Sequence, residues 1–285
     1  MAWTKIKVFF RMIDLEHSLF ALPFAYMGAL LAARGVPGGW ELLWITTAMI
    51  GARTAALCLN RLIDRHIDRA NPRTAHWAMA SGQLSVFWVW VAVVICLAIL
   101  LVSAYMLNPL CLKLAPLAVL ALWGYSYTKR FTWWCHLLLG MAIGIGPVGG
   151  WIAITGSMDW RPLVLWLVVA FWVGGFDTMY ACQDVEFDRS RGLYSVPARF
   201  GVAAALKISA LLHFLVVVLL ALSGAIFDLN GVYYAGTAFV AALLLYEHLL
   251  VGPGDLEQVN TASFRVNHYV GLILLAVTAA GVLWS

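Results

Sequence analysis

Two clusters of acidic residues place several carboxylates on one face of a helix, an arrangement suited to holding a divalent cation. The first cluster, Asn60, Asp64 and Asp68, advances in four-residue steps, and such steps keep side chains on one helix face. Neighbouring carboxylates repel each other, and Mg²⁺ relieves the repulsion because it prefers carboxylate oxygens together with the phosphate oxygens of a substrate. The alternative is a solvated helix end whose aspartates pair with neighbouring arginines, namely Arg61, Arg65 and Arg69.

A second acidic cluster has the same spacing and lies 120 residues further along the chain. Asp177, Tyr180, Asp184 and Asp188 share a helix face, and Gln183 precedes Asp184. Two such arrays favour a functional site over a chance grouping, because together they can hold metal ions across a diphosphate group. We therefore predict a magnesium site whose ligands are Asn60, Asp64, Asp68, Asp184 and Asp188.

Basic residues accompany both arrays and are candidates for binding phosphate. Arg73 follows the first array in the sequence NPRT, and Arg189 follows the second array directly. Lys129 comes four residues after Tyr125, so these two side chains lie on one helix face. For any one of these cations, membrane topology alone is an alternative explanation. Arg53 lies deep in an apolar segment and requires a polar cavity or an anionic partner there.

The composition predicts the surroundings in which these residues act. Of the 285 residues, 63% are hydrophobic and only 11% are charged, with a mean hydropathy of +0.88. A soluble domain has about 25% charged residues, so a soluble enzyme, a disordered chain and a fibrous protein are disfavoured. The net charge of +4 without a basic run gives no indication of nucleic-acid binding. The five cysteines lack CxxC spacing and indicate neither disulfides nor a thiolate metal site.

Nine segments are long and apolar enough to span a bilayer, which takes about 20 residues in a helix. A β-barrel would instead show short runs of alternating polarity. The predicted fold is therefore all-α, a multi-pass membrane bundle of about nine transmembrane helices. The predicted spans are 17–34, 41–60, 85–106, 109–127, 133–155, 161–184, 203–226, 230–250 and 265–284.

The distribution of positive charge predicts the orientation of the chain. Fourteen Lys and Arg residues fall in the N-terminal segment and in the loops after the even-numbered spans, whereas only Arg34 and Arg161 fall on the other side. Because cytoplasmic loops carry the excess of positive charge, we expect a cytoplasmic N-terminus, both arrays on the cytoplasmic side and the C-terminus outside. Residues 1–16 mix charge with bulky apolar groups and are expected to lie along the membrane surface.

The chain also carries signs of a weak internal repeat. Asp64 and Asp68 precede Asp184 and Asp188 by 120 positions, and Tyr125 precedes a tyrosine at the end of the eighth span by 121. Two four-helix halves followed by a ninth helix would produce this offset.

The motifs NxxxDxxxD, YxxxK and DxxYAxQDxxxD, together with the nine spans, resemble the UbiA superfamily of intramembrane aromatic prenyltransferases. The segments 16–33 and 176–201 are most similar to its 4-hydroxybenzoate polyprenyltransferase branch. The resemblance covers nearly the whole chain. It implies a single domain over 1–285, a bundle around a central cavity, and cytoplasmic caps formed by 61–84 and 185–202.

The resemblance also implies the reaction, the magnesium-dependent transfer of a prenyl group from a polyprenyl diphosphate to 4-hydroxybenzoate. In this mechanism Arg73 and Lys129 take up negative charge as the allylic C–O bond breaks, and Tyr125 and Tyr180 stabilise the carbocation through cation–π contact. A carboxylate, Asp184 or Asp188, takes the ring proton. The expected substrate contacts also include Arg53, Asp177, Gln183 and Arg189, with Arg53 on either the acceptor's carboxylate or the diphosphate.

The expected partners are the two substrates and the lipid bilayer, with neither nucleic acid nor an obligatory protein partner. Two positions depart from the superfamily's pattern, Trp77 where members commonly carry Arg, and Tyr194 where they often carry His or Lys. These departures put the phosphate contacts of the loops in question.

Three other functions are alternatives to this one. The same chemistry can act on a different acceptor, such as a naphthoate, haem, chlorophyllide or a glyceryl phosphate ether. A secondary transporter of an anionic substrate would place charges at breaks of helices near the membrane midplane, but here they cluster at the cytoplasmic ends. An intramembrane aspartyl protease needs one aspartate from each of two helices, not four carboxylates with a shell of Arg and Lys.

Overall fold

The computed structural model describes residues 2–13 and 21–284, and nearly all of this part of the chain is helical. An isolated bridge between Gly252 and Asp255 is the one piece of β-structure among the described residues. The all-α prediction is therefore confirmed. The longer helices are α1 (Ala2–Met12), α3 (Leu22–Ala33), α4 (Gly39–Ala70), α5 (Val86–Leu107), α6 (Pro109–Gly124), α7 (Cys135–Ile143), α8 (Ile145–Thr155), α9 (Pro162–Tyr180), α12 (Val202–Ile226), α13 (Gly231–Leu250) and α14 (Asn267–Leu283).

Eight helical stretches in the described chain are long and apolar enough to cross a membrane, and α3 is a shorter apolar helix beside them. This number is close to the predicted nine. Part of the predicted first span (17–34) and part of the predicted surface segment (1–16) lie outside the described residues. Within that surface segment α1 is helical, and its last residue, Met12, packs with Cys58 and Leu62 of α4.

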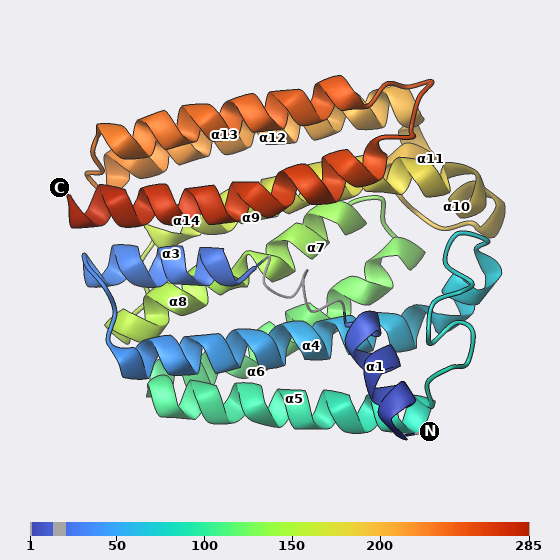
Figure 1. Cartoon of the computed structure of the whole chain (residues 1–285), viewed down its shortest axis with the longest axis horizontal. Helices are drawn as coiled ribbons and strands as arrows, with labels where there is room; N and C mark the ends of the chain where they lie inside the picture. Colours follow the sequence, from blue (N-terminus) through green and yellow to red (C-terminus); the bar gives the residue numbers. More distant parts are fainter. Residues whose placement is uncertain (1, 14–20, 285) are drawn as a thin grey trace.

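The long helices run side by side along the bundle, and short elements gather at one of its ends (Figure 1). The two helices that carry the acidic arrays each pack along the next long helix, α4 along α5 and α9 along α12. This correspondence agrees with the predicted four-plus-four repeat. The short elements are the loop after α4 and the helices α10 (Val185–Arg191) and α11 (Val196–Phe200).

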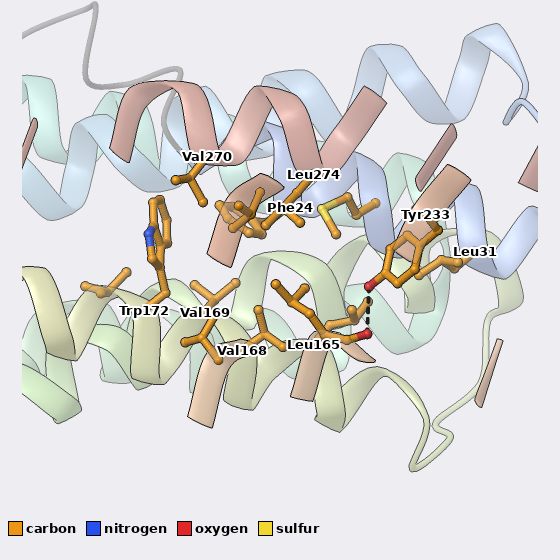
Figure 2. Packing of buried hydrophobic residues seen from close by; sticks show 14 of the residues in the cluster. Phe24, Leu31, Leu165, Val168, Val169, Trp172, Tyr233, Val270 and Leu274 are labelled. Carbon is orange, nitrogen blue, oxygen red and sulfur yellow. Dashed lines mark hydrogen bonds between the residues drawn. The ribbon is translucent and has the colours of Figure 1, made fainter. Parts of the chain in front are cut away.

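The largest buried cluster joins α3, α9 and the three last helices. Figure 2 shows Trp172 and Leu165 of α9 opposite Phe24 of α3 and Leu274 of α14. In the same cluster the Tyr233 hydroxyl donates to the Leu220 carbonyl oxygen at 3.1 Å, which gives this buried polar group a partner. The cluster makes α9 the fixed central element from which the second acidic array projects.

Glycines allow α3 and α8 to cross in close contact. A Cβ atom on Gly28 would lie 2.0 Å from the Pro147 carbonyl oxygen, and one on Gly150 would lie 2.0 Å from the Ala25 carbonyl oxygen. Such small residues are common where membrane helices meet, because they let the backbones approach. The close crossing packs α3 firmly against α8.

Helices change their winding where they reach the site. After α6 the chain tightens into the 3-10 helix η1 (Tyr125–Arg130), and after α9 into the 3-10 helix η2 (Ala181–Asp184). The structure extends α4 to Ala70, so the first part of the expected cap 61–84 is helical and its remainder is a loop. Asp64 and Asp68 therefore lie on successive turns of a regular helix.

Candidate active site

A cavity of about 750 Å³ opens where the ends of α4 and α9 meet η1 and the loop after α4. All the predicted site residues except Gln183 and Arg189 line it: Arg53, Asn60, Asp64, Asp68, Arg73, Tyr125, Lys129, Asp177, Tyr180, Asp184 and Asp188. Gln183 and Arg189 instead donate to the backbone carbonyl oxygens of Tyr180 and Ala198. The structure thus brings both acidic arrays to one cavity and leaves these two residues outside its lining.

The first array is neutralised by cations from η1. The Asp64 side chain is only 3% exposed, and its two oxygens accept from Lys129 Nζ at 2.8 Å and Arg130 Nη2 at 2.9 Å. The Asn60 amide donates to the same carboxylate at 3.0 Å. Asp68 pairs more loosely, with Arg61 Nη1 at 3.9 Å. Cationic pairing, in place of the expected repulsion between carboxylates, therefore dominates the substrate-free site.

The loop after the first array reaches across the cavity and binds the second array. Arg73 donates through Nε to Asp184 Oδ1 at 2.9 Å and through Nη2 to Oδ2, a bidentate pair. The Asn71 amide donates to Asp184 at 2.8 Å, and Arg73 also donates to the Tyr180 hydroxyl. Burial lowers the pKa of the Arg73 guanidinium, but its hydrogen bonds to Asp184 and Tyr180 outweigh this effect and raise the pKa overall. Arg73 therefore stays charged and ties the two arrays together.

The remaining carboxylates are held by a serine and a histidine. Asp188 accepts from the Ser195 hydroxyl at 2.8 Å, and Ser195 also caps the N-terminus of α11. Asp177 lies 2.7 Å from His136 Nδ1, while His136 Nε2 accepts from the Val196 backbone N–H at 3.3 Å. Because Nε2 accepts, this network assigns the ring hydrogen to Nδ1, which donates to Asp177.

Several residues that line the cavity or bind its carboxylates did not emerge from the sequence. Asn71 and His136 carried no spacing signal, although Asn71 begins the NPRT motif. Arg61 was considered only as a solvated partner of the aspartates, and Arg130 only as one of the positive charges that set the topology. Their contacts with the cavity arise from elements distant in sequence, so spacing alone could not reveal them.

A second, apolar cavity of about 660 Å³ adjoins the first. Its walls are mostly apolar residues of α3 to α9, among them Ala25, Ile45 and Leu100. Arg53 and Tyr125 line both cavities and therefore mark the boundary between them. An elongated apolar chain can therefore lie in the apolar cavity while its charged head lies in the polar cavity.

The donor set fits magnesium bound together with a phosphate group. Oxygen donors line the polar cavity, as Mg²⁺ prefers. Among the described residues, however, no group of three or more His, Cys, Asp or Glu side chains is placed to hold a metal ion by itself. Mg²⁺ is commonly held by one or two carboxylates plus substrate phosphates, so this site suits a metal that arrives with a diphosphate.

The comparisons with known proteins agree with this chemistry. The sequence pattern of the UbiA prenyltransferase family matches residues 21–281. The 4-hydroxybenzoate octaprenyltransferase of Pseudomonas aeruginosa is 32% identical over 88% of this chain and 84% of that protein. The enzyme of the same name from Providencia stuartii is 30% identical over 96% of both chains.

Two solved structures have the same fold. The apo structure of a UbiA homologue from Aeropyrum pernix K1 is 34% identical, with a TM-score of 0.85 over 92% of this chain and 96% of that one. A UbiA homologue from Archaeoglobus fulgidus bound to GPP and Mg²⁺ is 20% identical, with a TM-score of 0.68 over 96% of this chain and 99% of that one.

Removal of Asp64 should turn the first array into an anion site. We expect Asp64→Ala to destabilise the substrate-free protein by about 1–3 kcal/mol, because Lys129 and Arg130 lose their shared carboxylate. Inorganic pyrophosphate without magnesium should then raise the unfolding midpoint of the variant more than that of the wild type. Thermal unfolding in detergent measures both effects. Asp159→Ala, which removes a half-buried partner of Arg161 at the opposite end of α9, is the control, and equal responses in all three proteins would contradict the prediction.

Proposed function

Because the chain belongs to the UbiA prenyltransferase family, we propose that it transfers a polyprenyl group from a polyprenyl diphosphate to 4-hydroxybenzoate. One observation carries the proposal: two acidic arrays and their cations surround a polar cavity that continues into an apolar one. The names of the relatives from Pseudomonas and Providencia support 4-hydroxybenzoate as the acceptor.

Binding of the diphosphate exchanges the ion pairs of the cavity. When bound, Mg²⁺ neutralises the diphosphate and makes it a better leaving group. Asp64 and Asp184, one from each array, would hold the ion together with the diphosphate. Lys129 and Arg73, which bind these carboxylates in the substrate-free protein, then turn to the phosphate oxygens. The cations are already in the cavity, so the exchange needs no large movement of the backbone.

The boundary between the two cavities suits the reacting carbon. The prenyl tail lies in the apolar cavity, and its allylic carbon lies beside Tyr125, which lines both compartments. The aromatic rings of Tyr125 and Tyr180 stabilise positive charge as the C–O bond breaks. The apolar walls exclude water, which would otherwise quench the carbocation.

The acceptor must reach the same boundary with its carboxylate paired and its ring facing the cation. Arg53 lines both cavities, and we assign it to the carboxylate of 4-hydroxybenzoate. A carboxylate of the second array, Asp184 or Asp188, takes the ring proton after the new C–C bond forms. The Asp177–His136 pair fixes the wall against which the acceptor lies.

Turnover with defined substrates tests the proposed function. The purified chain should prenylate 4-hydroxybenzoate with labelled farnesyl diphosphate. EDTA should abolish the reaction, because without Mg²⁺ the charge of the diphosphate is not neutralised and the diphosphate is a poor leaving group. Product formation is measured by chromatography of the label. If the label is transferred preferentially to a naphthoate or a glyceryl phosphate ether, that compound replaces 4-hydroxybenzoate as the proposed acceptor. Label transfer to none of the acceptors would overturn the proposal.

The two arrays should act as one magnesium site. We expect Asp64→Ala and Asp184→Ala each to lower kcat by about 100-fold or more, because each removes a contact that stabilises charge in the transition state. Asp159→Ala, far from the cavity, should keep the wild-type rate. Magnesium titrations of the folded variants measure the effect. Wild-type rate and magnesium dependence in the Asp184 variant alone would show that the second array is dispensable.

The chain is an integral membrane protein, and the charge distribution supports a cytoplasmic active site. In this orientation the N-terminus is cytoplasmic and the C-terminus is outside. The excess of positive charge in the N-terminal segment and in the loops after the even-numbered spans supports this orientation. A phosphatase reporter fused after residue 285 should therefore be active, since this enzyme works only outside the cytoplasm. Activity of a cytoplasmic reporter at the same position would reverse the orientation.

A further inference from the structure

Arg61 is a cation of the polar cavity that the roles above do not use. It follows Asn60 on α4 and lines the cavity, and its side chain is 22% exposed. Its guanidinium carbon lies 3.7 Å from the centre of the Trp77 ring, and its nearest carboxylate oxygen belongs to Asp68, at 3.9 Å. Within the described part of the chain, no hydrogen bond from this guanidinium reaches an acceptor.

Three neighbouring cations are committed to carboxylates. Lys129 and Arg130 approach Asp64 within 2.9 Å, and Arg73 forms a bidentate pair with Asp184. A bound anion must displace those contacts before it can use these side chains. Arg61 lines the cavity and pairs only loosely with Asp68, at 3.9 Å, so an anion can bind its N–H donors with less competition.

Trp77 fixes the plane in which Arg61 presents these donors. The indole ring lies against the Arg61 guanidinium on one side, and the Arg73 guanidinium carbon is 5.8 Å from the same ring. Stacking on an aromatic face orients the planar guanidinium and leaves its edge available for hydrogen bonds. Trp77 therefore aligns one cation beside another without consuming the donors of either.

We propose that Arg61 binds a phosphate of the prenyl diphosphate, and that Trp77 is a positioning residue that holds its guanidinium in plane. This assignment rests on the proposed function. Arg61 precedes Asp64 by three residues and Asp68 by seven, so it shares their helix face and approaches the diphosphate from the same side as the first array. A guanidinium edge matches two phosphate oxygens, which a lysine ammonium cannot do.

Equilibrium binding of inorganic pyrophosphate with magnesium tests the role of Arg61 without any turnover. We expect Arg61→Gln to weaken binding at least about tenfold, as the loss of a charge-assisted hydrogen bond does. Arg61→Lys should have an intermediate effect, because it keeps the positive charge and loses the paired N–H donors of the guanidinium. Calorimetry on the full-length protein in detergent measures the affinity. The control is Arg65→Gln on the same helix, whose side chain bonds to His66 and lies outside the cavity lining.

Variants of Trp77 separate positioning from packing. Trp77→Leu should weaken pyrophosphate binding severalfold, whereas Trp77→Phe, which keeps a flat ring, should change it by less than about twofold. In the Arg61→Gln background, Trp77→Leu should cause no further loss, because the indole acts through the guanidinium. In turnover assays Arg61→Gln should raise the KM for farnesyl diphosphate and leave the KM for 4-hydroxybenzoate unchanged.

Distinct outcomes overturn the separate parts of this proposal. Wild-type pyrophosphate affinity in folded Arg61→Gln removes Arg61 from the diphosphate site, and a rise only in the KM for 4-hydroxybenzoate assigns it to the acceptor instead. A further loss from Trp77→Leu in the Arg61→Gln background refutes positioning by Trp77. A wild-type protein that binds pyrophosphate but prenylates no acceptor overturns the proposed function and leaves the binding role of Arg61 standing.

Discussion

Charge neutralisation among the cavity side chains is the constraint on which the site depends. A charged group near the apolar part of a membrane costs several kcal/mol unless it is paired. Asp64 is almost fully buried and is matched by Lys129 and Arg130, and Asp184 is matched by Arg73. These pairs hold η1 against α4 and the loop after α4 against η2. The substrate-free protein is thereby stabilised by the same cations that a diphosphate needs.

This constraint explains why the chain departs from regular helix at the site. The 3-10 segments η1 and η2 follow α6 and α9 at the end of the bundle where the arrays meet. Their tighter winding turns successive side chains through a larger angle than an α-helix does. Lys129 and Arg130, which are adjacent in sequence at the end of η1, reach the two oxygens of one carboxylate. The loop after α4 supplies Arg73 at the opposite wall.

The parts of the site that follow from local spacing could be predicted, and the parts that depend on tertiary contacts could not. Four-residue steps on α4 placed Asp64 and Asp68 on one face, as the structure shows. The spacing of the second array predicts a continuous α-helix there, but η2 interrupts it, and Gln183 lies outside the cavity lining. His136 lies on α7 and meets Asp177 of α9 only through folding. Trp77 departs from the family pattern, and the spacing of the sequence does not show that its ring stacks on the Arg61 guanidinium.

The contact between a polar and an apolar cavity decides where bond cleavage is favoured. Charge separation needs strong electrostatic partners on the phosphate side and weak nucleophiles on the carbon side. The carboxylates and cations line one cavity, small and aliphatic side chains line the other, and Arg53 and Tyr125 belong to both. A prenyl diphosphate that occupies both cavities must place its scissile C–O bond near this boundary. The position of the boundary, marked by the depth of Arg53 on α4, therefore governs where this bond lies in the protein, whereas the length of the apolar cavity governs which tails fit.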